Sequence, residues 1–106
     1  MWSIETLDET VDDELTALPV DMRARFQRIC ELIGSLGLER GGELHVKHLE
    51  GKLWEMRMAG RDGIARAIYV TAKGRRVIVL RAFMKKTEKT PRSELRLAAE
   101  RARRLG

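Results

Sequence analysis

Hydrophobic residues follow a helical period in the first third of the chain. Val11, Leu15 and Leu18 recur at the spacing that places side chains on one helix face. Thr6 and Glu9 have the spacing of a capping box, so we expect this helix to begin there. We interpret the Asp and Glu residues of this N-terminal segment, up to Glu14, as a solvated helix face.

A second helix is predicted directly after the first. Pro19 disfavours helical geometry at Leu18 and is itself well suited to a helix start, so one helix ends and another begins at this point. Gly34 and Gly37 supply residues that end it. Its apolar stripe is most simply part of the core, and it consists of Met22, Phe26, Ile29 and Ile33.

The period changes from helical to alternating in the second half of the chain. The segments 53–58, 64–71 and 76–83 are rich in β-branched and alternating apolar residues, and short turns at 60–63 and 72–74 join them. Two short turns between three strands predict an antiparallel meander. Residues 2–7 alternate as a short strand, and residues 39–52 are expected to be a loop with at most a short extended piece at 45–47.

A final helix is predicted from Thr90, which is suited to the N-cap position, followed by Pro91 at the first helical position. The sequence therefore predicts one α+β domain over residues 1–106, with an antiparallel sheet packed on an N-terminal helix pair and a C-terminal helix. The narrow apolar stripe of this last helix is formed by Leu95, Ala98, Ala99, Ala102 and Leu105.

Charge is distributed unevenly along the chain. Residues 5–14 contain six acidic residues and no Lys or Arg, whereas the segment from residue 73 onward is strongly basic, and the net charge is +5. A basic half favours a polyanionic partner such as nucleic acid or an acidic protein, although basicity alone fits a solvated surface equally well. No apolar run approaches a membrane span, no signal peptide is visible, and a single cysteine, Cys30, fits a reducing cytoplasm as a small core residue.

The residues suited to catalysis are mainly cationic. Two histidines three apart, His45 and His48, are a weak zinc signal without a cysteine partner, so no metal or other cofactor is expected. Arginines within strands usually lie on solvated faces, but a row of guanidinium groups on one exposed sheet face can bind a phosphate bidentately. The cationic set, with its possible proton-transfer partners, is Lys47, Arg57, Arg66, Lys85, Lys86 and Lys89 with His45, His48 and Tyr69.

Such a set suits RNA cleavage, because RNA carries its own nucleophile in the 2′-hydroxyl group. The protein has to align that oxygen, stabilise the developing charge and move protons. Neighbouring cations lower each other's pKa, so the Lys85–Lys86 pair can hold a neutral amine part of the time. The sequence leaves the acid and base open among Lys85, Lys86, His45, His48 and Tyr69.

Three strings of residues resemble those of a known family. They are HVKHLEGKLWEMR at 45–57, ARAIY at 65–69 and FMKKTEKTP at 83–91. Together they resemble the RelE/HigB superfamily of bacterial toxin–antitoxin toxins, and most closely its phage-related HigB-like branch. The resemblance covers nearly the whole chain, and it implies a β-α-α-β-β-β-α fold like that of microbial RNases.

The resemblance also implies a function. It implies a metal-independent endoribonuclease that cleaves mRNA, usually on the translating ribosome, and that a cognate antitoxin neutralises, often a helix-turn-helix DNA-binding protein. Carried over by position, the resemblance assigns catalysis to Arg66, Lys85 and Lys86. RNA or phosphate binding is assigned to Lys47, Arg57, Lys89, Tyr69 and His48. No tyrosine or histidine follows Tyr69, which departs from the family pattern.

Two alternatives share the same sequence features. A toxin of the same fold that inhibits a protein such as DNA gyrase, as ParE toxins do, would use the lysine cluster as a docking patch. A plain nucleic-acid-binding domain is the other alternative. The aromatic residues argue against it, because they form no exposed cluster in the sequence pattern that would stack bases; they are Trp2, Phe26, Trp54, Tyr69 and Phe83.

Overall fold

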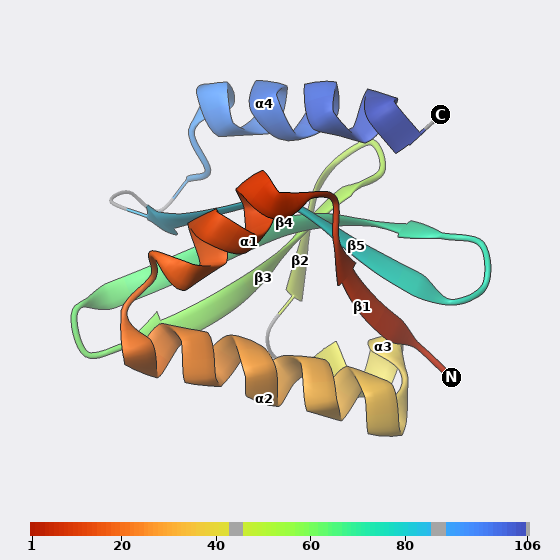
Figure 1. Ribbon diagram of the computed structural model, residues 1–106, viewed down its shortest axis with the longest axis horizontal. Coiled ribbons are helices and arrows are strands. Elements are labelled where there is room, and N and C mark those ends of the chain that lie inside the picture. The colour runs from red at the N-terminus through yellow and green to blue at the C-terminus, as the bar shows by residue number, and fades with distance from the viewer. Residues whose placement is uncertain (43–45, 86–88, 106) are drawn as a thin grey trace.

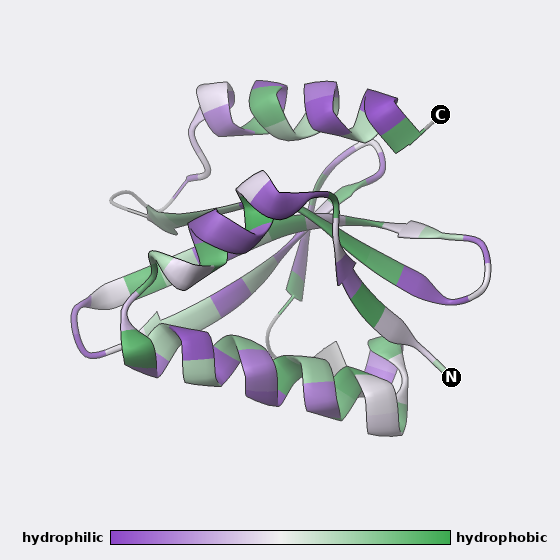
Figure 2. Cartoon of the chain, in the orientation of Figure 1, coloured by the Kyte–Doolittle hydropathy of each residue, from purple (hydrophilic) through white to green (hydrophobic). Residues whose placement is uncertain are grey.

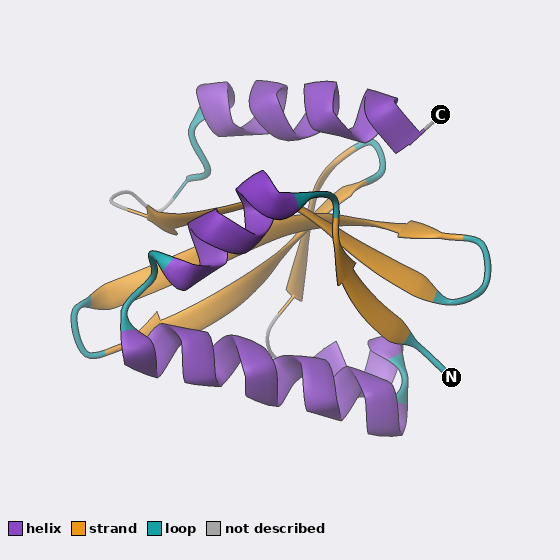
Figure 3. Cartoon of the chain, in the orientation of Figure 1, coloured by secondary structure: helices purple, strands orange, loops and turns teal. Residues whose placement is uncertain are grey.

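The computed structural model describes residues 1–42, 46–85 and 89–105, and the chain forms one sheet with helices on both faces (Figures 1 and 3). Its elements in chain order are β1 (Ser3–Thr6), α1 (Glu9–Thr16), α2 (Val20–Leu36), α3 (Leu38–Gly42), β2 (Val46–Glu50), β3 (Leu53–Gly60), β4 (Gly63–Ala72), β5 (Arg76–Lys85), α4 (Arg92–Ala102) and a short 3₁₀ helix, η1 (Arg103–Leu105). None of the described helices is both long and apolar enough to cross a membrane.

The sheet has five strands in the order β1-β5-β4-β3-β2. The predicted meander is confirmed, because β3, β4 and β5 pair antiparallel through their tight turns. Two features differ from the expected arrangement. The first is that β1 pairs parallel to β5, with Ser3 opposite Arg76. The second is that the segment 39–52, expected to be a loop, contains most of α3 and the edge strand β2, which pairs antiparallel with β3.

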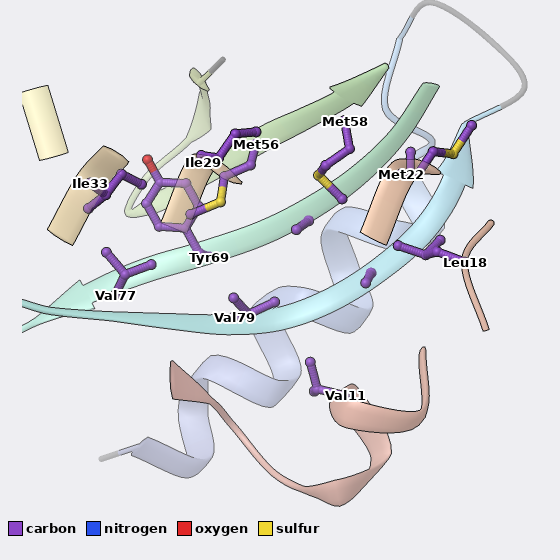
Figure 4. Close-up of a cluster of buried hydrophobic side chains, with 13 residues drawn as sticks. Val11, Leu18, Met22, Ile29, Ile33, Met56, Met58, Tyr69, Val77 and Val79 are labelled. Atoms are coloured by element: carbon purple, nitrogen blue, oxygen red, sulfur yellow. The ribbon is translucent and has the colours of Figure 1, made fainter. Parts of the chain in front are cut away.

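The core consists of two layers, one on each face of the sheet. On the first face, α1 and α2 cover β3, β4 and β5, and Figure 4 shows Ile29 and Ile33 beside Met56 and Tyr69 at one end of the cluster, with Met22 near Leu18 at the other. On the second face, the small residues of α4 pack over Ile68, Val70, Ile78 and Leu80. The apolar stripes of α2 and α4 are visible as green segments between purple ones (Figure 2). The N-terminal helices therefore cover one face, and the C-terminal helix covers the other.

The helix starts differ from two of the sequence predictions. Asp8, rather than Thr6, caps α1: its side chain accepts a hydrogen bond from the N–H of Val11, while the hydroxyl of Thr6 donates to Asp12. Pro91, rather than Thr90, is the N-cap residue of α4. The side chain of Thr90 is therefore available for another contact, and the structure uses it at the candidate site.

A network of charged side chains completes the exposed edge of β5. β1 ends at Thr6, opposite Val79, so beyond that point the backbone of β5 is paired with β4 on one side and with no described strand on the other. Glu14 of α1 accepts a hydrogen bond from the N–H of Ala82 at 3.1 Å, and Arg101 of α4 donates to the carbonyl of Leu80 at 2.8 Å. These side chains take the place of a strand partner, which protects an edge that would otherwise be open to pairing.

The same network shows that the prediction of a solvated acidic face is wrong for Glu14. Its side chain is 14% exposed and forms ion pairs with Arg81 and Arg101, each at 2.9 Å. Burial alone would raise the pKa of the Glu14 carboxyl. The hydrogen bonds from Arg101 and from the N–H of Ala82, together with the two positive charges, outweigh that effect and hold the pKa below its usual value.

Candidate functional site

The candidate site lies on the second sheet face, beyond the N-terminal end of α4. Leu53, Glu55 and Arg57 alternate along β3 and share this face. Arg57 lies directly opposite Arg66 of β4 in the strand register, so two arginines meet across neighbouring strands. Two like charges in direct cross-strand contact are destabilising unless an acid compensates them. Glu55 provides that compensation.

Glu55 is the centre of a buried hydrogen-bonded cluster. Nη1 of Arg66 donates to Oε1 of Glu55 at 3.0 Å, and the hydroxyl of Thr90 donates to Oε2 at 2.7 Å. Nε of Arg57 lies 3.8 Å from Oε1. The Glu55 side chain is 1% exposed and the Arg66 side chain is 4% exposed. A charged pair this deeply buried is stable only when both members are paired, as they are here.

The electrostatics of Arg66 follow from this burial. Burial lowers the pKa of its guanidinium, the charge of Glu55 opposes that effect, and the nearby Arg57 adds to it. One of its donors, Nε, is buried without a hydrogen-bond partner among the described residues. Unpaired buried donors are rare in folded proteins and mark places where an additional group can bind.

The prediction that Arg66 belongs to a row of exposed guanidinium groups is wrong. Only 3% of that residue is exposed, whereas the side chain of Arg57 is 44% exposed. Lys47 of β2 is also exposed and lies opposite Glu55 in the strand register, so it flanks the cluster on the same face. The structure therefore presents Arg57 and Lys47 at the surface and places Arg66 beneath it.

The lysine cluster follows the last strand at the same end of the sheet. Lys85 is the final residue of β5, and its backbone pairs with Ile64, two register positions from the pairing of Arg66 with Phe83. Lys86 lies outside the described residues, as does the side chain of Lys85. Lys89 is exposed and directly precedes Thr90, which is anchored on Glu55. The described backbone thus brings Lys85 and Lys89 to the end of the sheet that carries Arg57 and Arg66.

Two of the predicted RNA-binding residues lie elsewhere. His48 and Tyr69 are on the first face, where His48 contacts Trp54 with ring centroids 4.9 Å apart and Tyr69 lies opposite Trp54 in the strand register. Burial raises the pKa of Tyr69 to about 12, so its hydroxyl stays protonated at neutral pH and cannot act as a base there. The candidate set is therefore divided between the two faces of the sheet.

The aromatic residues also differ from their predicted arrangement. Trp2, Trp54 and Tyr69 line one pocket of about 530 Å³ on the first face, together with Leu38 and Val46. The sequence pattern indicates no such cluster, because Trp2, which directly precedes β1, is distant from Trp54 and Tyr69 in the sequence. Trp54 is 38% exposed at this pocket. The pocket is separate from the Glu55 cluster.

The structure describes no group of three or more metal-binding side chains within residues 1–42, 46–85 and 89–105. His45, one of the two histidines, lies outside these ranges. Cys30 is partly buried, and burial raises the pKa of its thiol to about 12, so it stays protonated at neutral pH. This agrees with the prediction of a packing role for Cys30.

A family model described as "Phage derived protein Gp49-like (DUF891)" matches residues 13–103. The chain belongs to this family. The Gp49-like family is one of RelE/HigB-like toxins, which confirms the resemblance seen in the sequence. A comparison with curated protein sequences finds no match.

The fold of this Gp49-like chain is that of RelE. It is similar to a chain of the crystal structure of the archaeal RelE-RelB complex from Pyrococcus horikoshii OT3, with a TM-score of 0.57 and 24% sequence identity. The match covers 80% of this chain and 96% of the archaeal chain. At this identity the comparison establishes the common fold, and it agrees with the α+β prediction.

Sequence reasoning missed Glu55 and Thr90 as members of the site. A signal for Glu55 was present, since it alternates with Leu53 and Arg57 on one strand face, and an isolated acid between two apolar or basic neighbours of a central strand requires a partner. Thr90 was assigned to the helix cap instead. The candidate site of the Gp49-like chain therefore consists of the buried Glu55–Arg66 ion pair and the exposed cations Arg57 and Lys47 beside it.

Proposed function

We propose that this Gp49-like chain is the toxin of a type II toxin–antitoxin system and that it cleaves mRNA on the ribosome. The observation that carries the proposal is the convergence of Arg57, Arg66, Lys47 and the start of the lysine segment on one end of one sheet face. Cations gathered from four strands suit a phosphate backbone, because their combined field attracts polyanions to one place.

The chemistry proposed for this site is an internal transfer within the RNA. The 2′-hydroxyl gives its proton to a general base as its oxygen attacks the adjacent phosphorus, the bond from phosphorus to the 5′-oxygen breaks, and the leaving oxygen takes a proton from a general acid. The candidates for these two roles are Lys85, Lys86, His45 and His48. The products are a 2′,3′-cyclic phosphate and a 5′-hydroxyl end. Arg66, Lys85 and Lys86 stabilise the charge that develops on the phosphate, and no metal ion is required.

RNA binding is proposed for the more exposed residues. Arg57 and Lys47 flank the buried Glu55 cluster, and Lys89 follows the lysine segment. These side chains make salt-dependent contacts with phosphates and position the substrate over Arg66. For His48 and Tyr69, RNA contact requires a strand that passes around the β2 edge of the sheet, because both residues lie on the opposite face.

An antitoxin partner is proposed on the same grounds. The similar archaeal RelE was crystallised as a RelE-RelB complex. For this chain we propose a cognate antitoxin, of the helix-turn-helix DNA-binding kind, with an acidic segment that covers the lysine cluster and the basic α4. Such a segment neutralises charge and blocks the site together. Because mRNA and ribosomes are the proposed targets, we propose a cytoplasmic location for the protein.

One observation favours the alternative of a toxin that binds a protein such as DNA gyrase. Arg66 is almost completely buried, and a guanidinium held by Glu55 reaches a phosphate only if the side chains around it move. In that alternative the Glu55–Arg66 pair is purely structural and the exposed cations form a docking surface.

Induced expression with mapping of mRNA 5′ ends within minutes separates the two functions. For the proposed nuclease we expect new 5′ ends inside translated messages, and we expect them to disappear in an Arg57→Ala/Lys85→Ala/Lys86→Ala variant that remains folded. Growth arrest with intact mRNA and altered DNA supercoiling would instead establish the gyrase-type function. A folded triple variant that still cleaves mRNA would show that the site is elsewhere.

A further inference from the structure

We propose that Glu55 is a positioning residue for RNA cleavage. It holds the guanidinium of Arg66 and the hydroxyl of Thr90, and through Thr90 it fixes the chain just before α4. The proposal rests on the proposed function and adds a residue to it. Glu55 is not proposed to contact substrate, because both of its carboxylate oxygens are engaged, one by Arg66 and one by Thr90. It acts through the two groups that donate to it.

The two carboxylate oxygens of Glu55 serve different elements. Oε1 accepts from Arg66 of β4 at 3.0 Å, whereas Oε2 accepts from Thr90 at 2.7 Å. Thr90 lies between the lysine segment and α4, and Pro91 begins the helix. A single buried carboxylate on β3 therefore fixes both the strand arginine and the point where the lysine segment returns to the fold.

The geometry at Arg66 shows what this arrangement controls. Glu55 engages Nη1, and within the described part of the chain Nε remains buried without a partner. Charge-assisted hydrogen bonds to a carboxylate hold a guanidinium in one plane, so Glu55 determines which donors of Arg66 are left unpaired. A phosphate oxygen that reaches Arg66 would satisfy an unpaired donor, whereas a guanidinium free to rotate would lose this preorganisation.

Charge compensation is the second role of Glu55. Arg57 lies 3.8 Å from the same oxygen that binds Arg66, so one carboxylate lies between two guanidinium groups that face each other across β3 and β4. Without that negative charge the two arginines would repel each other. We infer that Glu55 allows both cations to occupy the one end of the sheet where RNA is proposed to bind.

The first test compares Glu55→Gln with wild type on translating ribosomes. Because removing one charge of the buried pair also destabilises the fold, the comparison is made at a temperature where circular dichroism shows that the variant is folded. Glutamine keeps the size of the side chain and an oxygen that accepts from Thr90, but it removes the charge. Because residues that orient a functional group typically affect activity by roughly 10-fold to 100-fold, we expect kcat to fall by about that factor while KM changes by less than about 3-fold. Thr90→Val should lower kcat by a smaller factor.

A matched control removes another arginine-paired glutamate. Glu50 pairs with Arg92 at 3.0 Å, but the two side chains are 49% and 69% exposed. We expect Glu50→Gln to leave kcat unchanged. An equal loss in the two variants would show that the effect comes from any change of surface charge, and the proposal would be overturned.

A double-mutant comparison shows whether Glu55 acts through Arg66. In an Arg66→Lys background, Glu55→Gln should lower kcat much less than it does in the wild-type chain, because the positioned guanidinium is already absent. Additive losses would contradict the proposal. If Arg66→Lys alone leaves cleavage unchanged, the assignment of Arg66 itself is wrong.

A spectroscopic measurement gives a readout that does not depend on activity. In ¹⁵N-labelled protein, the guanidinium of Arg66 should show slow rotation in wild type and in Glu50→Gln, and fast rotation in Glu55→Gln. Unchanged slow rotation in Glu55→Gln would overturn the positioning role even if cleavage is lost. A wild-type protein that holds Arg66 rigidly but cleaves no RNA would overturn the proposed function instead.

Discussion

Replacing Arg66 alone is expected to unfold or severely destabilise the protein, whatever its role in catalysis. The residue is 3% exposed and its partner Glu55 is 0% exposed, so Arg66→Met leaves a buried carboxylate without its main cation. Arg57 lies 3.8 Å from that carboxylate and compensates only in part. Loss of toxicity in an Arg66 variant would therefore not by itself identify a catalytic residue.

The magnitude follows from the burial of the pair. Removing one member of a buried ion pair typically costs about 3–5 kcal/mol, a large share of the roughly 5–15 kcal/mol that stabilises an ordinary domain. At about 4 °C per kcal/mol for a domain of this size, the melting temperature should fall by about 12–20 °C. Glu55→Gln/Arg66→Met removes both charges and keeps an acceptor for Thr90, so it should lie within about 1 kcal/mol of wild type.

Urea unfolding monitored by tryptophan fluorescence measures these differences, and the growth assay is then made on the double variant. The account predicts that the single variant is unstable, and that the double variant is folded but no longer toxic. A single variant as stable as wild type would refute the inference that Arg66 compensates a buried charge. A folded double variant that remains fully toxic would remove Arg66 from the proposed reaction.

Three further outcomes are expected. Glu14→Ala should destabilise the fold by about 2 kcal/mol in urea unfolding, because it leaves the N–H of Ala82 without an acceptor; an unchanged midpoint would mean that water replaces the carboxylate. The pKa of Glu14 is lowered in the folded state, so the stabilisation that its carboxylate provides is fully present above the unfolded pKa near 4.5 and is lost as the pH falls through the lower folded value. The difference in the free energy of unfolding between wild type and Glu14→Gln should therefore shrink on acidification through that range. Gly60→Ala should cost about 1–3 kcal/mol, since an added Cβ would lie 2.6 Å from Oδ2 of Asp21, which also accepts the N–H of Arg61; a melting temperature equal to that of wild type would show that the Asp21 side chain moves away easily.

Periodicity was sufficient to predict most of the elements but not the edge strand β2. The segment VKHLE has a mixed burial pattern with three exposed residues, and it forms a strand because β3 offers it a free edge. A pairing partner is a property of the whole fold and is not encoded in the five residues themselves. The short strand β1 was predicted, whereas its parallel pairing with β5 depends on the same kind of tertiary choice.

The sequence already indicates on which face of the sheet or helix several of the candidate residues lie. Arg66 and Tyr69 are separated by three positions in one strand, and an odd separation places side chains on opposite faces. Lys47 and His48 are consecutive and diverge for the same reason. Glu14 lies three residues after Val11 and four before Leu18, so helical spacing already placed it on the buried stripe of α1. These three outcomes could have been derived from residue numbers alone.

The burial of Arg66 could not have been derived in this way. It depends on the cross-strand position of Glu55, on the hydroxyl of Thr90 from a distant segment and on the register of β3 against β4. A strand arginine on a solvated face and a strand arginine in a buried ion pair have the same local sequence. Only the assembled sheet distinguishes them.

The chemistry of the RNA ends tests the central claim most directly. Purified protein is incubated with translating ribosomes in the presence of a metal chelator that leaves the ribosomal magnesium in place, and the 3′ ends of the fragments are analysed. The account predicts fragments that end in a 2′,3′-cyclic phosphate and begin with a 5′-hydroxyl, from wild type and not from the folded Glu55→Gln/Arg66→Met variant. Fragments with a free 3′-hydroxyl, or intact mRNA during growth arrest, would contradict it.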